Sequence, residues 1–435
     1  MIFHQFANIF KLSSEATQSY MERCFTVAIE NKSFLELDFN WVVSKLLASS
    51  ELFVTSEREV LDAAYRWLSR DFGERGKFGA RLLLKVRLRL LFSRDLKIIE
   101  SSSLSSSENS RCHAMLKKAF ESNELGATRK SRYCSQKSFG VLVCGGCLKT
   151  DHGMHRYDNP FNMKQFSFEP DLNCVRVHPS TNKNRKAFEA VYLKGDVYVF
   201  AGNPIYKYSC GDRDMSIEKY SLATESWAGV AVMGDRRRNY CVCAFVDKIL
   251  LFGGFCWNER QWDRPCLRLN TTTRQLEEVS PMARFGRKEA ACAVFEERIV
   301  VCGGAGGSGR CVNWADSYDV YEDAWTPMPD MVVERKCHKL VAVESKLFVI
   351  GGSFFTCEVY DGMSKKFVEL RCPFPMERCQ ALSVGSKIFV FGSYTWVGSA
   401  SYDFEEDKWS EESRDEITGA VLDFYCVKLP FYRQN

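Results

Sequence analysis

Short apolar runs that end at glycine recur along the chain from about residue 139 onward. Four of them end in a glycine pair ("VLVCGG", "ILLFGG", "IVVCGG" and "LFVIGG"), and "VYVFAG" and "IFVFGS" are degenerate copies. The second positions of these endings are separated by 56, 52, 50, 48 and 41 residues. A repeated interval of this size predicts an array of similar units rather than isolated strand ends. The glycines of the repeat are Gly145, Gly146, Gly202, Gly253, Gly254, Gly303, Gly304, Gly351, Gly352 and Gly392.

Each unit carries a second mark, a pair of apolar or aromatic residues that are seven positions apart. Polar residues typical of tight turns separate the two members, as a β-hairpin requires. Each unit therefore reads as strand, glycine pair, loop, strand, turn and strand, and six units of this kind predict an all-β, six-bladed propeller. We expect the aromatic members to pack between blades. The pairs are Phe168/Val175, Tyr220/Trp227, Leu269/Leu276, Tyr318/Trp325, Tyr360/Phe367 and Tyr402/Trp409.

The glycine pair followed by tyrosine and tryptophan at a fixed offset, about fifty residues per unit, resembles the kelch repeat. The first unit has little strand material before "VLVCGG", whereas the C-terminus carries a spare apolar run, "ITGAVLDFYCVKLP". We expect this run to pair with the first blade, because the pairing would remove an open sheet edge.

The N-terminal part has a helical period instead. Ser56 and Glu59 form a capping box at the start of one segment, and Val60, Ala64 and Trp67 then fall on one face. The phrases "LLASSELFVTSE", "EVLDAAYRWLSRD" and "LLLKVRLRLL" are similar to the BACK domain of kelch-like proteins. The predicted organisation is an all-α BACK-like domain, truncated at its start, over 1–125, a linker over 126–138 and the kelch propeller over 139–435.

These two resemblances together identify the chain as similar to the kelch-like family, and they carry implications for function. Family members usually begin with a BTB domain that holds the cullin scaffold of a ubiquitin ligase, and no BTB segment precedes the BACK-like part. The resemblance therefore implies a substrate-recognition adaptor that needs a BTB domain from elsewhere to reach a cullin. The alternative is an actin-binding or cytoskeletal scaffold protein without a ubiquitin role.

Composition limits the class of protein and the cell compartment that we expect. The net charge is +4 and no apolar run reaches 18 residues, which argues against a nucleic-acid binder and a membrane span. The N-terminus lacks the features of a signal peptide. Nineteen irregularly spaced cysteines, many inside apolar runs, fit reduced thiols better than a disulfide framework. We expect a cytoplasmic protein, with cytoskeletal or nuclear placement as alternatives.

Arginines recur sixteen residues before the first position of the glycine pair, in the loop that in the family joins neighbouring blades. Gathered on one rim they would bind an acidic peptide segment through bidentate contacts. The alternative, left open, is that each is a solvated turn residue. Tryptophans in the loops after the glycine pairs would complete such a protein-binding rim. The candidate binding residues are Arg185, Arg237, Arg287, Arg335, Arg378, Trp257, Trp314 and Trp396.

Other chemistry is weakly indicated. "CGGC" at 144–147 lacks a second Cys-x-x-Cys, and "GAGGSG" at 304–309 opens no helix, so neither a zinc site nor a phosphate loop is expected. No nucleophile elbow, zinc-protease motif or kinase motif is found, so we predict no catalytic residue, metal or cofactor. The sequence leaves undetermined the target, the oligomeric state, the binding residues on the rim, and whether the missing BTB domain reflects a fragment, an isoform or true loss.

Overall fold

The computed structural model describes most of residues 25–99 and most of the strands and loops between 139 and 430. Within these limits, longer gaps lie at 101–138, 149–164, 205–214 and 256–265, and shorter ones occur elsewhere. The chain divides into two compact units, one of residues 1–139 with 430–435 and one of residues 140–429. The predicted linker over 126–138 lies outside the described residues. No helix in the described parts of the chain has the length and apolar character needed to cross a bilayer.

The first unit is helical and is built around one amphipathic helix. Val60, Ala64 and Trp67 of this helix are buried, as the sequence predicts. The Trp67 indole donates a hydrogen bond to the Leu37 carbonyl at 2.9 Å, so its one polar atom is satisfied inside the core. The helices are α3 (Phe25–Ile29), η1 (Lys32–Glu36), α4 (Glu57–Ser69), α5 (Phe72–Arg75), η3 (Gly76–Phe78) and α6 (Gly79–Leu83).

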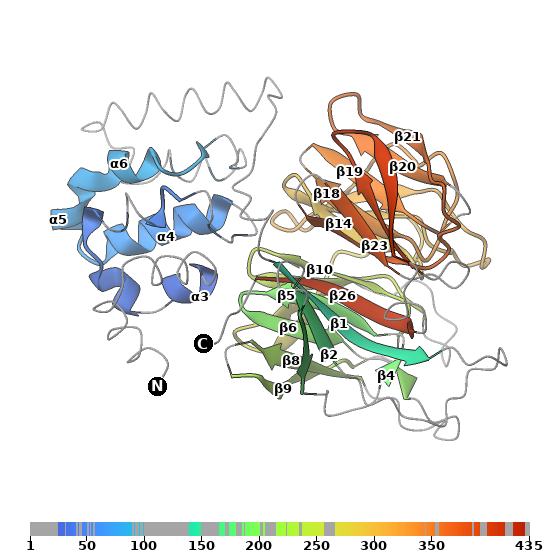
Figure 1. Cartoon of the computed structure of the whole chain (residues 1–435), viewed down its shortest axis with the longest axis horizontal. Helices are drawn as coiled ribbons and strands as arrows, with labels where there is room; N and C mark the ends of the chain where they lie inside the picture. Colours follow the sequence, from blue (N-terminus) through green and yellow to red (C-terminus); the bar gives the residue numbers. More distant parts are fainter. Residues whose placement is uncertain are drawn as a thin grey trace. The chain divides into compact units, whose positions relative to one another are not determined.

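The second unit is a β-propeller of antiparallel four-stranded sheets (Figure 1). Five of these sheets follow one another along the chain, and their inner strands β5, β10, β14, β18 and β22 contact each other in that order. The first of the five sheets consists of β5 (Glu189–Leu193), β6 (Asp196–Phe200), β8 (Ser216–Ser221) and β9 (Ser226–Val232). The second consists of β10 (Cys241–Phe245), β11 (Lys248–Phe252), β12 (Cys266–Asn270) and β13 (Gln275–Val279). The other three are β14 (Ala291–Phe295), β15 (Arg298–Cys302), β16 (Ala315–Asp319), β17 (Ala324–Pro327); β18 (Lys339–Val343), β19 (Lys346–Ile350), β20 (Thr356–Asp361), β21 (Lys366–Arg371); and β22 (Gln380–Val384), β23 (Lys387–Phe391), β24 (Ser399–Asp403), β25 (Lys408–Ser413).

A further four-stranded sheet joins the two ends of the propeller sequence in the order β26-β1-β2-β3. Its strands are β1 (Phe139–Leu148), β2 (Gln165–Glu169), β3 (Cys174–His178) and β26 (Val421–Pro430), and a small ribbon pairs β4 (Arg185–Lys186) with β7 (Asn203–Pro204). Figure 1 shows β26 alongside β1, the pairing that the spare C-terminal run led us to expect. The side chains of this sheet lie outside the described part. Of the six predicted blades, five are therefore established by their packing.

The constant spacing of seven residues has a simple cause in the strand register. Its two members are directly opposite each other on the two outer strands of a blade: Tyr318 faces Trp325, Tyr360 faces Phe367, and the other four pairs do the same. The Tyr318 and Trp325 ring centroids are 4.9 Å apart. Cross-strand aromatic pairs of this kind stabilise a sheet.

Some of these aromatic residues also join neighbouring blades, as predicted. Tyr318 and Trp325 both meet Phe252 of the preceding blade, edge to face, at 5.6 and 5.4 Å between ring centroids. Phe295 meets Tyr360 at 5.8 Å in the next interface. In these two interfaces, an aromatic ring of one blade packs against the pair of its successor.

Two other tryptophans of the repeat, Trp227 and Trp409, also reach the connection that precedes their blade. Trp227 and Trp409 are only half-buried, whereas the tyrosines that face them are buried. Their rings lie against those tyrosines of their own blades, at 5.3 and 5.0 Å between centroids. Beyond the blade, each reaches a connecting segment: the Trp227 indole donates to the Pro179 carbonyl at 3.0 Å, and the Trp409 ring meets Phe374 edge to face at 6.2 Å. Trp325 is half-buried in the same way and donates to the Ser280 carbonyl at 2.9 Å, so all three tryptophans lie on the outermost strand of their blade and contact the preceding connection.

Candidate functional site

Two kinds of loop lie at the same edge of each blade. Since consecutive strands are antiparallel, the loop between the second and third strands ends on the same side as the connection from the fourth strand to the next blade. We call this side the loop face and define it by the connections 280–290, 328–338 and 372–379 together with the loop 303–314. Gly303, Gly304, Arg287 and Arg335 belong to these segments, and Arg237, Gly253, Gly254, Gly351 and Gly352 lie in the equivalent segments of other blades.

The glycine pair is the point where one blade touches the next. The Gly254 amide donates to the Arg287 carbonyl of the following blade at 2.8 Å, and Gly304 donates to Arg335 in the same way at 2.8 Å. A Cβ atom on Gly303 would lie 2.6 Å from the Arg335 carbonyl oxygen, and the φ of Gly303 is +60°. Only glycine fits both the left-handed backbone and the close approach.

The recurrent arginines are buried, which corrects the prediction of an exposed rim. Arg237, Arg287 and Arg335 are at most 2% exposed. Arg287 pairs with the buried carboxylate of Asp316 at 2.7 Å and donates to the Trp314 carbonyl at 2.9 Å. A buried guanidinium is favourable only when it is paired and hydrogen-bonded, as it is here.

Arg335 follows the same plan with a different acid. It pairs with Glu358 at 2.7 Å and donates to the carbonyls of Gly351 and Thr356. Glu358 in turn accepts hydrogen bonds from the amides of Val332 and Val333, in the connection between blades, at 2.7 and 3.0 Å. Each arginine therefore binds the preceding blade with its backbone carbonyl and its own blade with its guanidinium.

In other blades the positions of the arginine and of its acid are also buried, even where the residues are different. The matching positions of the last of the five blades hold Met376 and Ala400, an apolar pair that is also buried. In the blade of Arg237, which donates to the Gly253 carbonyl at 3.3 Å, the acid position is Leu267. Burial raises the pKa of the Asp316 carboxyl, against the opposing effect of the guanidiniums of Arg287 and Arg284.

Arg378 occupies a different position from the buried arginines. It is two residues beyond Met376 and is aligned with Asn239, Glu289 and Cys337 of the other blades. The amide of Glu289 donates to the Asn239 carbonyl at 2.7 Å, and the Cys337 amide donates to the Glu289 carbonyl at 2.9 Å. Asn239, Glu289 and Cys337 therefore form a backbone ladder from blade to blade. The Arg378 side chain is half exposed, and its guanidinium lies 3.7 Å from the Glu289 carboxylate.

A second cation reaches the same carboxylate. Lys336 Nζ lies 3.6 Å from Glu289 Oε2, and its side chain is 41% exposed. The side-chain amide of Asn239 also donates to the Glu289 carboxylate, at 3.2 Å. Two exposed cations from different blades thus share one carboxylate through ion-pair contacts that are longer than hydrogen bonds.

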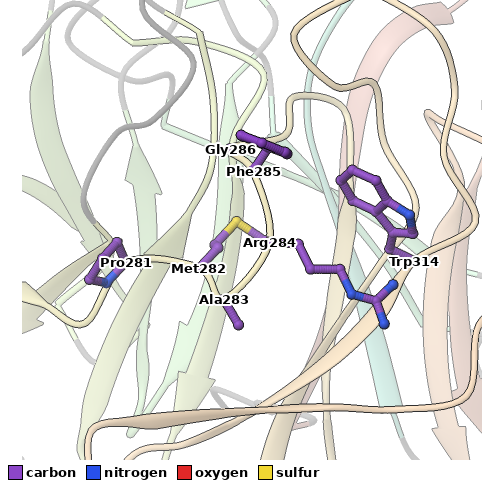
Figure 2. Close-up of a pocket in the computed structure, with 7 residues that line it drawn as sticks. All are labelled: Pro281, Met282, Ala283, Arg284, Phe285, Gly286 and Trp314. Atoms are coloured by element: carbon purple, nitrogen blue, oxygen red, sulfur yellow. The ribbon is translucent and has the colours of Figure 1, made fainter.

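An apolar pocket of about 630 Å³ opens where two loops of the loop face meet. Figure 2 shows the side chain of Arg284 extending toward Trp314, with Phe285 on the same connection. Phe285 is 71% exposed, an unusual position for a phenyl ring. The pocket is lined by Pro281, Met282, Ala283, Arg284, Phe285, Gly286 and Trp314.

The predicted site residues therefore divide into three groups. Trp314 and Arg378 belong to the loop face, whereas Arg237, Arg287 and Arg335 are structural. Of Arg185 only the backbone is described, and Trp257 and Trp396, like Gly202 and Gly392, lie outside the described residues. The carboxylates escaped notice, although an acid two positions before the repeat tyrosine (Asp316, Glu358) was a readable signal.

Cysteine and metal chemistry add little to the site. The ten cysteines with described side chains are free. Among the described residues, no group of His, Cys, Asp or Glu side chains could hold a metal ion. Burial raises the pKa of the Cys266 and Cys379 thiols to about 12, so these groups are protonated and unreactive at neutral pH. "CGGC" at 144–147 has no described side chains.

Comparison with known proteins agrees with this architecture. The family model described as the KLHDC2/KLHL20/DRC7 Kelch-repeats domain matches residues 134–352, and the model described as BTB And C-terminal Kelch (BACK) matches residues 1–100. Kelch-like protein 35 of Mus musculus is 26% identical over 436 residues, covering 97% of this chain and 72% of the relative. Kelch-like protein 7 of Rattus norvegicus is 26% identical over 435 residues, covering 94% and 69%. Kelch-like protein 25 of Xenopus tropicalis is 24% identical over 410 residues, covering 82% and 68%.

Proposed function

Since this chain belongs to the kelch-like family of protein-interaction adaptors, we propose that it recognises a target protein for a cullin-RING ubiquitin ligase in the cytoplasm. In this proposal the loop face of the propeller captures the target. The BACK domain links the propeller to the ligase, with a BTB domain providing contact with the cullin.

The observation that carries the proposal is the composition of the loop face. Phe285 and Val332 are 71% and 53% exposed on consecutive connections between blades. Arg378 and Lys336 lie on the same face and keep exposed cationic ends. Exposed aromatic residues beside arginine are typical of the residues that dominate protein interfaces.

The charge of the loop face favours an acidic target segment. Lys336 and Arg378 contact Glu289 at 3.6 and 3.7 Å, distances at which a guest carboxylate can compete for the same cations. Arg310, on the loop 303–314, is exposed, and no carboxylate of the described residues lies within 4 Å of its guanidinium. An acidic segment would therefore gain ion pairs without breaking a buried one.

We further propose that the sheet β26-β1-β2-β3 completes a ring of six blades. The supporting observations are its strand number, which equals that of the other blades, and its assembly from both ends of the propeller sequence. A closed ring would leave no unpaired edge strand, and it would hold the loop face in one shape.

The test is purification of the full chain from cells in which cullin deneddylation is blocked, with a Lys336→Glu/Arg378→Glu variant alongside. We expect a cullin subunit to co-purify with both proteins, and a set of ubiquitinated proteins to co-purify only with the wild type. Lys366→Glu, a charge reversal at the first residue of β21, at the opposite end of the blade from the loop face, is the matched control. Absence of a cullin subunit together with co-sedimentation on actin filaments would refute the ligase role and support a cytoskeletal scaffold.

A further inference from the structure

The pocket beside Trp314 is held open by charged side chains that are already engaged with each other. Arg284 donates to Asp330 at 2.6 Å and lies 3.4 Å from the Asp316 carboxylate. Asp316 is in turn fixed by the buried Arg287. The wall of the pocket is therefore anchored to the interior of the blade and does not need to be ordered by a ligand.

Trp314 is positioned by the same network. The guanidinium carbons of Arg284 and Arg287 lie 5.8 and 5.9 Å from the centre of its ring, within the range of cation–π attraction. The Trp314 carbonyl accepts from Arg287 and from the Gly303 amide at 2.8 Å, so its backbone is also fixed. A rigid aromatic wall binds with little loss of conformational entropy.

The lining of the pocket is mostly apolar, and one of its two loops carries an exposed cation. Pro281, Met282 and Ala283 provide carbon surface, and Phe285 extends this surface into solvent. Arg310 is on the same loop as Trp314 and is exposed. The charge of Arg284 is already neutralised by Asp316 and Asp330, so the pocket itself suits an uncharged group.

We infer that this pocket receives one bulky apolar side chain of an extended target segment, while an acidic residue next to that side chain binds Arg310. This inference rests on the proposed recognition role of the loop face and gives its target a chemical class. A protein segment fits better than an isolated small molecule because Phe285 and Val332 extend the apolar surface across two connections between blades.

The probe is a library of random peptides displayed on phage and selected against the full chain. We expect the enriched peptides to combine an aromatic or large aliphatic residue with a neighbouring acid. Fluorescence anisotropy of a labelled enriched peptide should then show at least about tenfold weaker binding to Phe285→Ala, since the loss of an interface anchor has effects of this size. Arg310→Ala should weaken binding by a smaller factor that shrinks as salt is raised.

Two further variants keep the result clear if one substitution disturbs folding. Ala283→Trp, on an exposed lining position, should fill the pocket and abolish binding while the thermal melt is unchanged. Met363→Ala removes an apolar side chain that is 64% exposed in a turn away from the loop face, and it should bind like the wild type.

The outcomes separate the two levels of the proposal. Enriched peptides that respond to Lys336→Glu/Arg378→Glu but not to Phe285→Ala or Ala283→Trp would overturn the pocket inference and leave recognition by the loop face intact. Failure to enrich any peptide, or enrichment that none of these variants affects, would overturn both.

Discussion

At the scale of the residue, the buried Arg287–Asp316 pair shows how the propeller interior can hold charge. Both side chains are fully buried and 2.7 Å apart, and the same two positions are Met376 and Ala400 in another blade. The fold therefore accepts an ion pair or an apolar pair, and in a third blade it holds Arg237 through the Gly253 carbonyl with Leu267 at the acid position. Where the acid is present, removal of the arginine would leave a buried carboxylate without its closest counter-ion.

This view predicts strong coupling between the two residues. Arg287→Met should lower the free energy of unfolding by about 3–5 kcal/mol, because Asp316 loses its buried partner. Arg287→Met combined with Asp316→Ala, which copies the apolar blade, should lose less than the single substitution. Urea denaturation of the three proteins measures the difference. A double variant that loses the sum of the two single losses would show that the residues are not coupled.

His338 provides a residue-scale prediction for pH. It is buried, and burial together with Arg335, Lys339 and Arg287 lowers its pKa to about 3. Unfolded histidine titrates near pH ~6.5, so between about pH 6.5 and 3 the unfolded chain binds a proton that the folded chain does not. Stability should therefore fall as pH decreases through this window, by up to about 1.4 kcal/mol per pH unit from this residue.

The check is a comparison of wild type with His338→Gln, whose side chain does not titrate. We expect the melting temperature of the variant to change less between about pH 7 and pH 5, within the window set by the two pKa values, than that of the wild type. Parallel curves for the two proteins would mean that the imidazole is solvated or paired.

At the scale of the element, the glycine pair determines how one blade meets the next. Gly303 and Gly309 both have left-handed backbone, with φ of +60° and +77°. A Cβ on Gly303 would meet the Arg335 carbonyl and the His338 ring at 2.6 Å, whereas nothing lies within 4 Å of one on Gly309. A side chain at Gly309 would therefore meet backbone strain alone, whereas a side chain at Gly303 would meet both backbone strain and crowding.

Alanine substitution at these positions should therefore give unequal losses. Gly309→Ala should cost about 1–2 kcal/mol, the price of left-handed backbone alone. Gly303→Ala should cost about 3 kcal/mol or more, because crowding against the next blade is added to that strain. Thermal unfolding of both variants compares them. Equal losses would mean that neighbouring blades can separate here at little cost.

At the scale of the whole molecule, the propeller depends on a strand taken from its far end. β26 pairs with β1, so the first sheet is assembled only after the last one has been synthesised. A sheet without that strand would expose the hydrogen-bonding edge of β1.

Deletion of residues 417–435 should therefore remove the single cooperative transition of the propeller in calorimetry. Deletion of residues 431–435 alone, which leaves β26 whole, is the matched control and should preserve the transition. An unchanged transition in the longer deletion would show that the other sheets are stable without closure.

The sequence by itself determined the repeat, the propeller class and the positions of the aromatic pairs. These features depend on local spacing, and a fixed offset of seven across the same turn places Tyr318 opposite Trp325. The N-terminal helix was readable for the same reason, since the period of its apolar residues already marks its buried face.

Which neighbours the tryptophans of those pairs meet was decided by the tertiary structure. The spacing treats Trp227, Trp325 and Trp409 alike, and all three are half-buried on the outermost strand of their blade. The Trp325 ring packs against Phe252 of the preceding blade, whereas the Trp409 ring packs against Phe374 of the preceding connection. The spacing holds no information on these partners, because the adjacent blade and connection supply them.

Only the tertiary structure decided which way the recurrent arginines point. The constant offset of sixteen residues before the glycine pair indicates that Arg237, Arg287 and Arg335 are equivalent. The offset does not say whether their side chains point into the blade or into solvent, and an arginine before a strand is usually solvated. Their direction depends on carboxylates and carbonyls that strand pairing brings from 16 to 29 residues away, such as Asp316 for Arg287. The pocket beside Trp314 likewise exists only where two separate loops are brought together, so its lining has no period to detect.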